Sequence, residues 1–121
     1  MEETIRIGEL ARRTGVSQRL LRYYEERGLL LPERRPSGYR EYDDADVGRV
    51  RRIRTLLAAG LSTTAIATVL PCTVVTAGGL AAACPALLKD LRREHTRISR
   101  TIAELNDART TLDAIIKATP R

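Results

Sequence analysis

Hydrophobic positions recur at helical spacing through most of the chain, and two short stretches alternate instead as strands do. The spacing predicts helices over residues 8–14, 17–27, 43–59, 62–70 and 86–118. Alternation predicts extended segments at residues 4–7 and 39–42. Gly, Ser or Asp stands at most helix boundaries, where such residues cap helices. A mainly α fold with one small β-hairpin is therefore expected.

The first two helices are separated by a turn of three residues. Gly15 is expected to end the first helix in a left-handed conformation, and Ser17 to cap the second. In the second helix, Leu20, Leu21 and Tyr24 are expected to pack inward with Val16. The opposite side then carries Gln18, Arg19, Arg22 and Tyr23. Such a face suits a DNA major groove, where Arg bonds guanine and Gln bonds adenine, although a solvated polar face is the alternative.

A hairpin is expected to follow this helix directly. Pro36 and Gly38 occupy the second and fourth positions that a type I turn favours, if Arg35 begins the turn. Aromatic and arginine side chains interleave in the return strand, which ends at Tyr42. A basic hairpin beside a helix-turn-helix is the layout of a wing, which grips the phosphate backbone, whereas a plain surface loop is the alternative.

The third and fourth helices complete a domain over residues 1–70. Asp43, Asp44 and Asp46 open the third helix, where acids favour the helix dipole. A stripe of Val47, Val50, Ile53, Leu56 and Leu57 is expected to be buried. The four arginines of this helix, at 49, 51, 52 and 54, cannot point one way, so some are expected to reach phosphate and some solvent.

Residues 86–121 are expected to form a dimerisation helix, because no Gly or Pro interrupts residues 86–118. At 1.5 Å per residue that helix is about 50 Å long. Seven of nine positions at three-four spacing are aliphatic, as in a coiled-coil seam: Leu88, Leu91, His95, Ile98, Ile102, Leu105, Arg109, Leu112 and Ile116.

The seam is symmetric about Ile102, which favours antiparallel pairing of two copies. Antiparallel pairing sets Leu88 against Ile116 and His95 against Arg109 of the second copy. Parallel pairing would stack Arg109 on its own equivalent, at a Coulomb cost. The sequence therefore predicts an antiparallel homodimer.

The charge of the chain indicates an anionic partner. The formal charge is +6 and the pI about 10, and ten of the 21 basic residues fall between Arg19 and Arg54, all as Arg. No apolar run is long enough to span a bilayer and the N-terminus is acidic, so a cytoplasmic location without membrane contact is expected. With one His and no Gly-rich phosphate loop, an enzyme is not expected.

The runs IGELARRTGVSQRLLRYYEERGLL and GYREYDDADVGRVRRIRTLLAAGLS resemble the DNA-binding domain of the MerR family of transcriptional regulators over about residues 4–70. The resemblance implies a homodimer with a winged helix-turn-helix, a second helical wing and a long antiparallel coiled coil. Many such proteins bind between promoter elements and bend and untwist an overlong spacer so that RNA polymerase can use the promoter.

The family's DNA contacts carry over onto Arg19, Arg22, Tyr23, Tyr39 and Arg40, and Gln18 is placed to read a base edge. The whole double-stranded DNA surface is expected to comprise Ser17, Gln18, Arg19, Arg22, Tyr23, Arg34, Arg35, Tyr39 and Arg40.

Residues 71–85 are expected to be a small-residue linker that contains Cys72 and Cys84. Three states are open for these cysteines: two reduced thiols, a disulfide that acts as a redox switch, or ligands of a soft metal ion such as Cu(I). No cofactor is otherwise indicated. Metal-responsive relatives use a Cys near the start of the dimerisation helix, which Cys84 resembles.

The function expected from these features is regulation of transcription by a homodimer on an inverted-repeat promoter site. An architectural protein that bends DNA without regulating a promoter directly is the alternative. The operator, the inducer, and activation as opposed to repression are not encoded in any motif of the chain.

Overall fold

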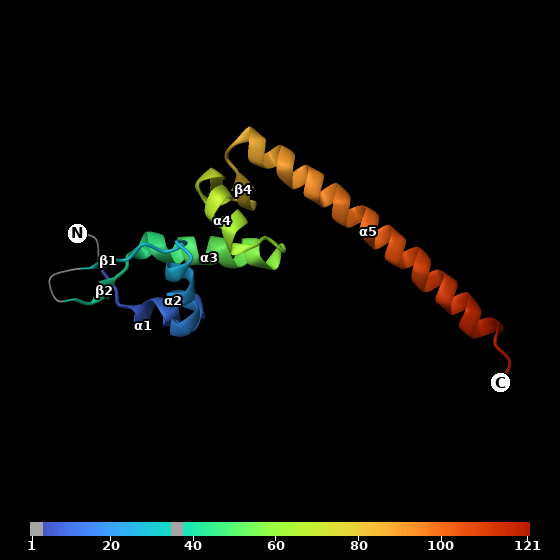
Figure 1. Cartoon of the computed structure of the whole chain (residues 1–121). Helices are drawn as coiled ribbons and strands as arrows, with labels where there is room; N and C mark the ends of the chain where they lie inside the picture. The colour runs from blue at the N-terminus through green and yellow to red at the C-terminus, as the bar shows by residue number, and fades with distance from the viewer. Residues whose placement is uncertain (1–3, 35–37) are drawn as a thin grey trace. The chain divides into compact units, whose positions relative to one another are not determined.

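The computed structural model describes residues 4–34 and 38–121, which form two compact units, one ending at Ala81 and the other running from Ala82 to Arg121 (Figure 1). The first unit contains four helices, a short 3-10 turn and two small hairpins. The second is one long helix. The elements are α1 (Ile7–Thr14), α2 (Gln18–Glu26), β1 (Glu33–Arg34), β2 (Arg40–Glu41), α3 (Asp44–Ala58), α4 (Thr63–Val69), η1 (Leu70–Cys72), β3 (Thr73–Thr76), β4 (Gly79–Ala82) and α5 (Pro85–Ala118).

The turn between α1 and α2 has the predicted caps. Gly15 ends α1 with φ 72°, and its N–H donates to the carbonyl of Ala11. Ser17 precedes α2, and its hydroxyl accepts a hydrogen bond from the Leu20 N–H at 3.1 Å. These two caps together set the sharp change of direction between the helices, so the helix-turn-helix is confirmed.

The inward face of α2 differs from the prediction at one position. Leu21 and Tyr24 are buried with Val16, but Leu20 is 39% exposed. Successive helical residues are about 100° apart, so Leu20 cannot share a narrow stripe with Leu21 and lies instead toward Tyr23, which is also exposed. The prediction that Leu20 packs inward was wrong.

The wing forms as an antiparallel pair, in which Glu33 faces Glu41 and Arg34 faces Arg40. Ile5 adds a single antiparallel bridge to Tyr42, which is less than the strand predicted at residues 4–7. The turn predicted at residues 35–38 falls largely outside the described residues. The bridge at Ile5 holds the segment before α1 beside the wing.

Helix α3 is the centre of the first unit's core. A capping box begins it: the Asp43 carboxylate accepts from the Asp46 N–H, and the Asp46 carboxylate accepts from the Asp43 N–H. Burial raises the pKa of Asp46. The predicted stripe of α3 is buried, although Leu57 is only partly so. Around it pack buried residues from every neighbouring element: Leu10, Val16, Leu21, Tyr24, Leu29, Leu30, Tyr42, Ile66 and Leu70.

Three of the four arginines of α3 donate hydrogen bonds to other parts of the first unit. Arg49 donates to the carbonyl of Leu29, and Arg54 donates to the carbonyl of Thr14 at 3.1 Å. Arg52 donates to the hydroxyl of Thr73 at 3.0 Å. Arg51 and Arg54 are exposed, in agreement with the predicted contact with solvent, whereas Arg49 and Arg52 are only partly exposed. Phosphate contact by any of these side chains stays a prediction.

Residues 71–85 contain secondary structure where the sequence indicated a linker. Pro71 lies inside η1, and strands β3 and β4 follow as a hairpin before Cys84. Leu80 of this hairpin packs against the core of the first unit. Helix α5 then runs unbroken for 34 residues, as predicted. Among the described residues, no helix is long and apolar enough to cross a membrane.

Candidate nucleic-acid interface

The outward face of α2 is polar and basic, as the periodicity predicts. Gln18, Arg19, Arg22 and Tyr23 are all exposed. Ser17 is exposed too, but its hydroxyl oxygen already accepts the capping hydrogen bond, so its first role is structural. The amide of Gln18 lies over Gly8 of α1, where an added Cβ would be 3.5 Å from Nε2. A helix face of this chemistry is able to enter a major groove.

The wing carries the other predicted contacts. Tyr39 is 57% exposed, and Arg40 forms an ion pair with Glu25 of α2, with Nε 3.2 Å from Oε2. The pair ties the wing to α2. The structure places the backbone of Arg34 in β1 without its side chain, and Arg35 lies outside the described residues.

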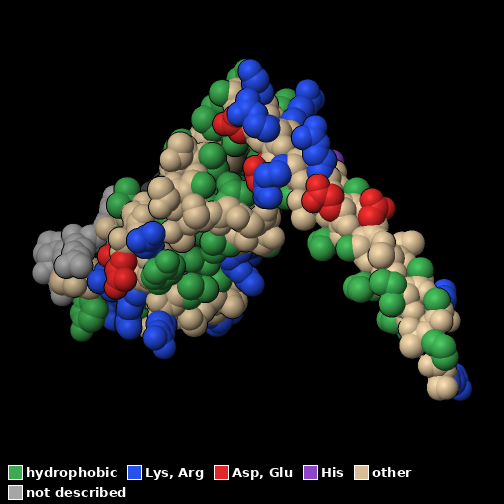
Figure 2. Space-filling view, turned by 45° about the vertical axis from the view of Figure 1, so that its right-hand side comes forward, with side chains coloured by type: hydrophobic (Ala, Val, Ile, Leu, Met, Phe, Trp, Pro, Cys, Tyr) green, Lys and Arg blue, Asp and Glu red, His purple; other side chains and the backbone are tan. Residues whose placement is uncertain are grey.

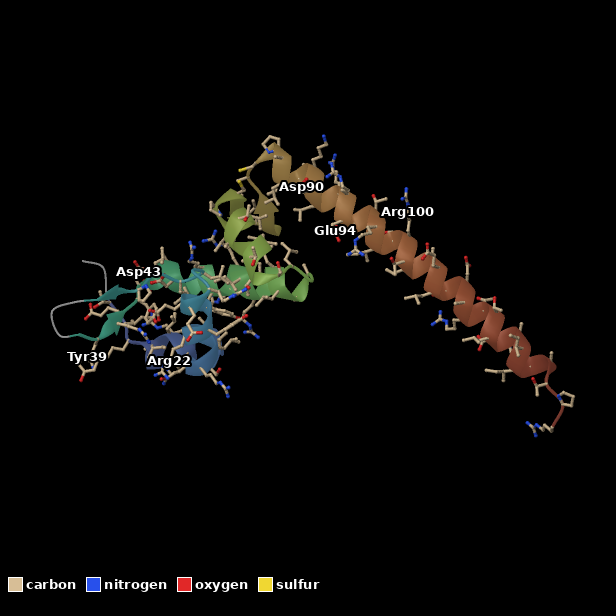
Figure 3. All side chains as sticks on the ribbon, viewed as in Figure 1. Arg22, Tyr39, Asp43, Asp90, Glu94 and Arg100 are labelled. Atoms are coloured by element: carbon tan, nitrogen blue, oxygen red, sulfur yellow. The ribbon has the colours of Figure 1, made fainter. Side chains whose placement is uncertain are left out.

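A hollow of about 390 Å³ lies between α1, α2 and the wing. Its described lining residues are Arg6, Ile7, Arg22, Gly38, Tyr39 and Arg40. The guanidinium of Arg6 stacks on the Tyr39 ring, with Cζ 4.4 Å from the ring centre. In Figure 3, Arg22 and Tyr39 lie on the same lower side of this unit. The geometry thus brings three arginines to one surface.

Arg6 is the residue that sequence reasoning missed here. It lies before the first helix, outside the arginine-rich stretch of residues 19–54, and nothing in the periodicity of α1 marks it. The bridge from Ile5 to Tyr42 and the contact with the Tyr39 ring place Arg6 beside the wing. The extended signal at residues 4–7 was the one sequence feature that pointed in this direction.

A partly buried polar cluster underlies the wing. Glu25 Oε2 is buried without a hydrogen-bond partner, since Arg40 is near enough for an ion pair but is not aligned for a hydrogen bond. The Tyr42 hydroxyl is also buried without a hydrogen-bond partner. Burial raises the pKa of the Tyr42 phenol, and the charge of Glu25 acts in the same direction. These groups position the wing but offer no open site for a ligand.

Helix α5 exposes aliphatic side chains at intervals from Leu88 to Ile116, and Figure 2 shows hydrophobic side chains between polar ones on the part of the helix toward its C-terminal end. Every aliphatic position of the predicted seam is at least 37% exposed in the single chain, as is Ile115 outside it. His95 and Arg109 are exposed as well. Exposed apolar positions with this spacing are typical of surfaces that bind another protein segment.

Both cysteines are disulfide-bonded, and none of the cysteines in the described part of the chain is free. Cys72 ends η1, and Cys84 immediately precedes α5, whose Leu87 and Leu88 N–H groups donate to its carbonyl. A disulfide sulfur is no thiolate, so this oxidised form does not fit a soft metal ion. Within residues 4–34 and 38–121, no group of three or more His, Cys, Asp or Glu is arranged to hold a metal.

Comparison with known proteins agrees with this geometry. The family model described as MerR HTH family regulatory protein matches residues 5–72. The chain is 36% identical over 126 residues to the nodulation protein NolA of Bradyrhizobium elkanii, covering 96% of this chain and 58% of NolA. It is 32% identical over 123 residues to the HTH-type transcriptional regulator HmrR of Rhizobium leguminosarum bv. viciae, covering 93% of this chain and 84% of HmrR.

A third relative is named as a repressor. The HTH-type transcriptional repressor CarH of Myxococcus xanthus is 39% identical over 71 residues, which cover 58% of this chain and 24% of CarH. The chain thus spans 58% of the length of NolA, 84% of HmrR and 24% of CarH. From the match over residues 5–72 and the helix-turn-helix that they form, this chain belongs to the MerR family of DNA-binding transcriptional regulators.

Proposed function

We propose that the protein regulates transcription as a homodimer bound to an inverted-repeat promoter site. The observation that carries this is the pairing of one helix-turn-helix per chain with an exposed apolar stripe on α5. One copy presents one recognition helix and therefore reads one half-site. A two-fold dimer presents two such helices in inverted orientation.

Antiparallel pairing of α5 is the arrangement that the side chains favour. With Ile102 at the two-fold axis, aliphatic residues face aliphatic residues, and His95 faces Arg109 of the second copy. Cysteine crosslinking in a Cys72→Ser, Cys84→Ser background tests the register. His95→Cys and Arg109→Cys should crosslink when the two variants are mixed, and Arg109→Cys alone should not. A strong 109-to-109 crosslink would refute the antiparallel register.

The DNA surface is proposed to consist of the outward face of α2 and the wing. Their exposure and charge support it, with Gln18, Arg19, Arg22 and Tyr23 for the groove and Tyr39 and Arg40 for the backbone. Arg34 and Arg35 are assigned to the same surface from the sequence alone. Ser17 is assigned to it beside its capping role.

Arg40 offers a test of the wing. Arg40→Gln should weaken binding to operator and unrelated DNA alike, and should reduce the slope of log K against log salt concentration by about 0.9 per half-site. The ion pair with Glu25 adds a prediction: Glu25→Gln removes the competing carboxylate and should leave the slope no smaller. Filter binding or fluorescence anisotropy at several salt concentrations measures both. An unchanged slope for Arg40→Gln would remove Arg40 from the phosphate contacts.

We also propose that binding bends and untwists the promoter spacer so that RNA polymerase can use it. The family resemblance of residues 4–70 supports this mode. Selection from random DNA should yield an inverted repeat of defined spacing, and a circular-permutation assay should detect a bend at its centre. Weak preference for shape without a repeat would favour the architectural alternative. A purified transcription system with spacers of altered length then tests the action on polymerase.

We propose that thiol–disulfide exchange is the signal that changes promoter binding by this protein. The two cysteines are the only ones in the chain and both are disulfide-bonded, so we propose that they are bonded to each other. A cellular dithiol would reduce the bond with two electrons and two protons, giving two thiols here and a disulfide in the reductant. The two cysteines flank the β3–β4 hairpin, directly before α5, so reduction would open the loop that such a disulfide closes around the hairpin.

Promoter binding and transcription by the oxidised and reduced forms test this signal. The two forms should differ, and the Cys72→Ser, Cys84→Ser variant should respond to neither oxidant nor reductant. Mass spectrometry after alkylation counts the thiols in each form. Equal activity of both forms would eliminate the redox signal, and a response of the reduced form to Cu(I) alone would favour the soft-metal alternative.

A further inference from the structure

The hollow between α1, α2 and the wing contains a cation that no sequence motif assigns, the guanidinium of Arg6. Arg6 has an extended backbone, with φ −88° and ψ 167°, directly before α1. Its predecessor Ile5 is buried and exchanges two backbone hydrogen bonds with Tyr42, at 2.7 and 2.8 Å. Since neighbouring residues in an extended segment point to opposite sides, burying Ile5 turns Arg6 outward.

Arg6 differs from the other arginines of this segment in its partner. Arg12 and Arg13 both bond the carboxylate of Glu9, and their hydrogen bonds lower the pKa of Glu9 to about 2. Arg6 instead stacks on the exposed ring of Tyr39. A guanidinium has five N–H donors, and those that are directed away from the ring remain able to bond an anion.

Three guanidinium groups line the same hollow, from three separate elements: Arg6 before α1, Arg22 on α2 and Arg40 on β2. The lining residues described for it include no acidic side chain. Arg40 pairs with Glu25 through Nε, and a guanidinium has two further nitrogens with which to donate. The hollow is thus electropositive, and Arg22 and Tyr39, which line it, lie on the same lower side of the unit in Figure 3.

We propose that Arg6 is a further DNA-contacting residue, which binds a phosphodiester group of the backbone together with Arg22 and Arg40 while it holds the Tyr39 ring in place. The planar fork of arginine matches two phosphate oxygens, and a phosphodiester carries the negative charge that the hollow lacks. This inference rests on the proposed function. It adds a contact from the segment before the first helix to those of the recognition helix and the wing.

The test is the salt dependence of DNA binding by Arg6→Gln. One phosphate contact fewer in each half-site should reduce the magnitude of the slope of log K against log salt concentration by about 0.9 per half-site, or about 1.8 for a dimer. The affinity loss should be the same for operator and unrelated duplexes, because phosphates carry no sequence information. Arg6→Lys keeps the charge and should keep most of the slope. Circular dichroism verifies that each variant is folded.

Arg100→Gln is the matched control, because it removes one exposed arginine from α5 and no charge from the hollow. Its slope should equal that of the wild type. Tyr39→Leu removes the ring and leaves Arg6. If Arg6 also holds the ring, the losses from Arg6→Gln and Tyr39→Leu should be less than additive in the double variant.

Three results would overturn the inference. A loss of affinity with an unchanged slope would mean that Arg6 only packs against Tyr39. In the second, inorganic phosphate competes with DNA at constant ionic strength only when Arg6 is present, while Arg6→Gln leaves the salt slope unchanged. That result would indicate a small-anion site in place of a DNA contact. If the wild-type protein binds no duplex DNA, the proposed function is wrong, and the Arg6 contact is wrong with it. A reduced slope for Arg6→Gln alongside an unchanged one for Arg100→Gln supports it.

Discussion

Tyr42 is a core residue whose hydroxyl has no hydrogen-bond partner among the residues that the structure describes. The residue is 2% exposed, its backbone pairs with Ile5, and it belongs to the same core cluster as the buried residues of α3. A buried hydroxyl that loses its water without gaining a partner costs roughly 1–3 kcal/mol. The same burial raises the pKa of the phenol, so ionising it in the folded state is unfavourable.

Replacing this hydroxyl should therefore not weaken the fold. We expect Tyr42→Phe to leave the free energy of unfolding unchanged or to raise it by up to about 1 kcal/mol, measured by urea denaturation at neutral pH. A loss greater than about 1 kcal/mol would show that the hydroxyl bonds a group or a water molecule in solution.

The pH dependence gives a second measure of the same residue. Because the folded pKa of Tyr42 is raised, its contribution to stability is complete below the unfolded pKa of about 10 and is lost as the pH rises through the higher folded value. Tyr24 is buried and has a raised pKa as well. The wild type should thus lose stability in alkali, and Tyr42→Phe should lose less.

At the scale of elements, the turn between α1 and α2 sets the angle at which the recognition helix is presented. Gly15 makes this turn with φ 72°, in the left-handed region where a side chain costs roughly 1–2 kcal/mol. Arg54 of α3 donates to the carbonyl of Thr14 beside it. The left-handed conformation of Gly15 and the long-range hydrogen bond to Thr14 therefore fix two consecutive residues of this turn.

Gly15→Ala should lower the free energy of unfolding by about 1–2 kcal/mol and weaken DNA binding with it. Gly48→Ala is the matched control. Gly48 lies inside α3 with helical backbone and no atom within 4 Å of an added Cβ, so alanine there should stabilise the protein by about 0.5–1 kcal/mol. Thermal and urea unfolding compare the two. Equal effects of the two substitutions would contradict the assignment of strain to Gly15.

At the scale of the whole molecule, dimerisation is expected to decide whether two recognition helices act together. The aliphatic seam of α5 is exposed in the single chain, and pairing two copies would bury it. Linking two half-site readers raises the affinity for an inverted repeat by roughly 10²–10⁴-fold over one reader. A change on α5 is therefore expected to affect DNA binding without touching the DNA surface.

Ile102→Glu is the sharpest such change, because an antiparallel dimer sets the two Ile102 positions against each other. We expect the variant to sediment as a monomer at concentrations at which the wild type is a dimer, and to lose at least about 100-fold in affinity for a duplex with two half-sites. Binding to a single half-site should be unaffected. Thr101→Glu adds the same charge one residue away from the seam, and this variant should sediment with the mass of the wild-type dimer. A dimeric Ile102→Glu would place the interface elsewhere.

The sequence by itself determined most of the elements and their boundaries. Gly15, Ser17, Asp43 and Ser62 act through local caps, and the stripe of α3 and the length of α5 follow from hydrophobic spacing. Such features depend on residues within about one helical turn, so periodicity and capping rules reach them. The family and its DNA-binding role followed from the same N-terminal motifs.

Only the tertiary structure decided which arginines are available to a partner. Arg49, Arg52 and Arg54 bond groups that are 20, 21 and 40 residues distant in the chain, respectively, and Arg6 lies beside the wing because a bridge joins residues 5 and 42. Spacing along the chain carries no information about such long-range partners, because a guanidinium bonds whichever carbonyl, ring or carboxylate the fold brings near it. Charge counted along the sequence therefore indicated a DNA-binding surface, and packing decided which arginines remain exposed for the proposed one.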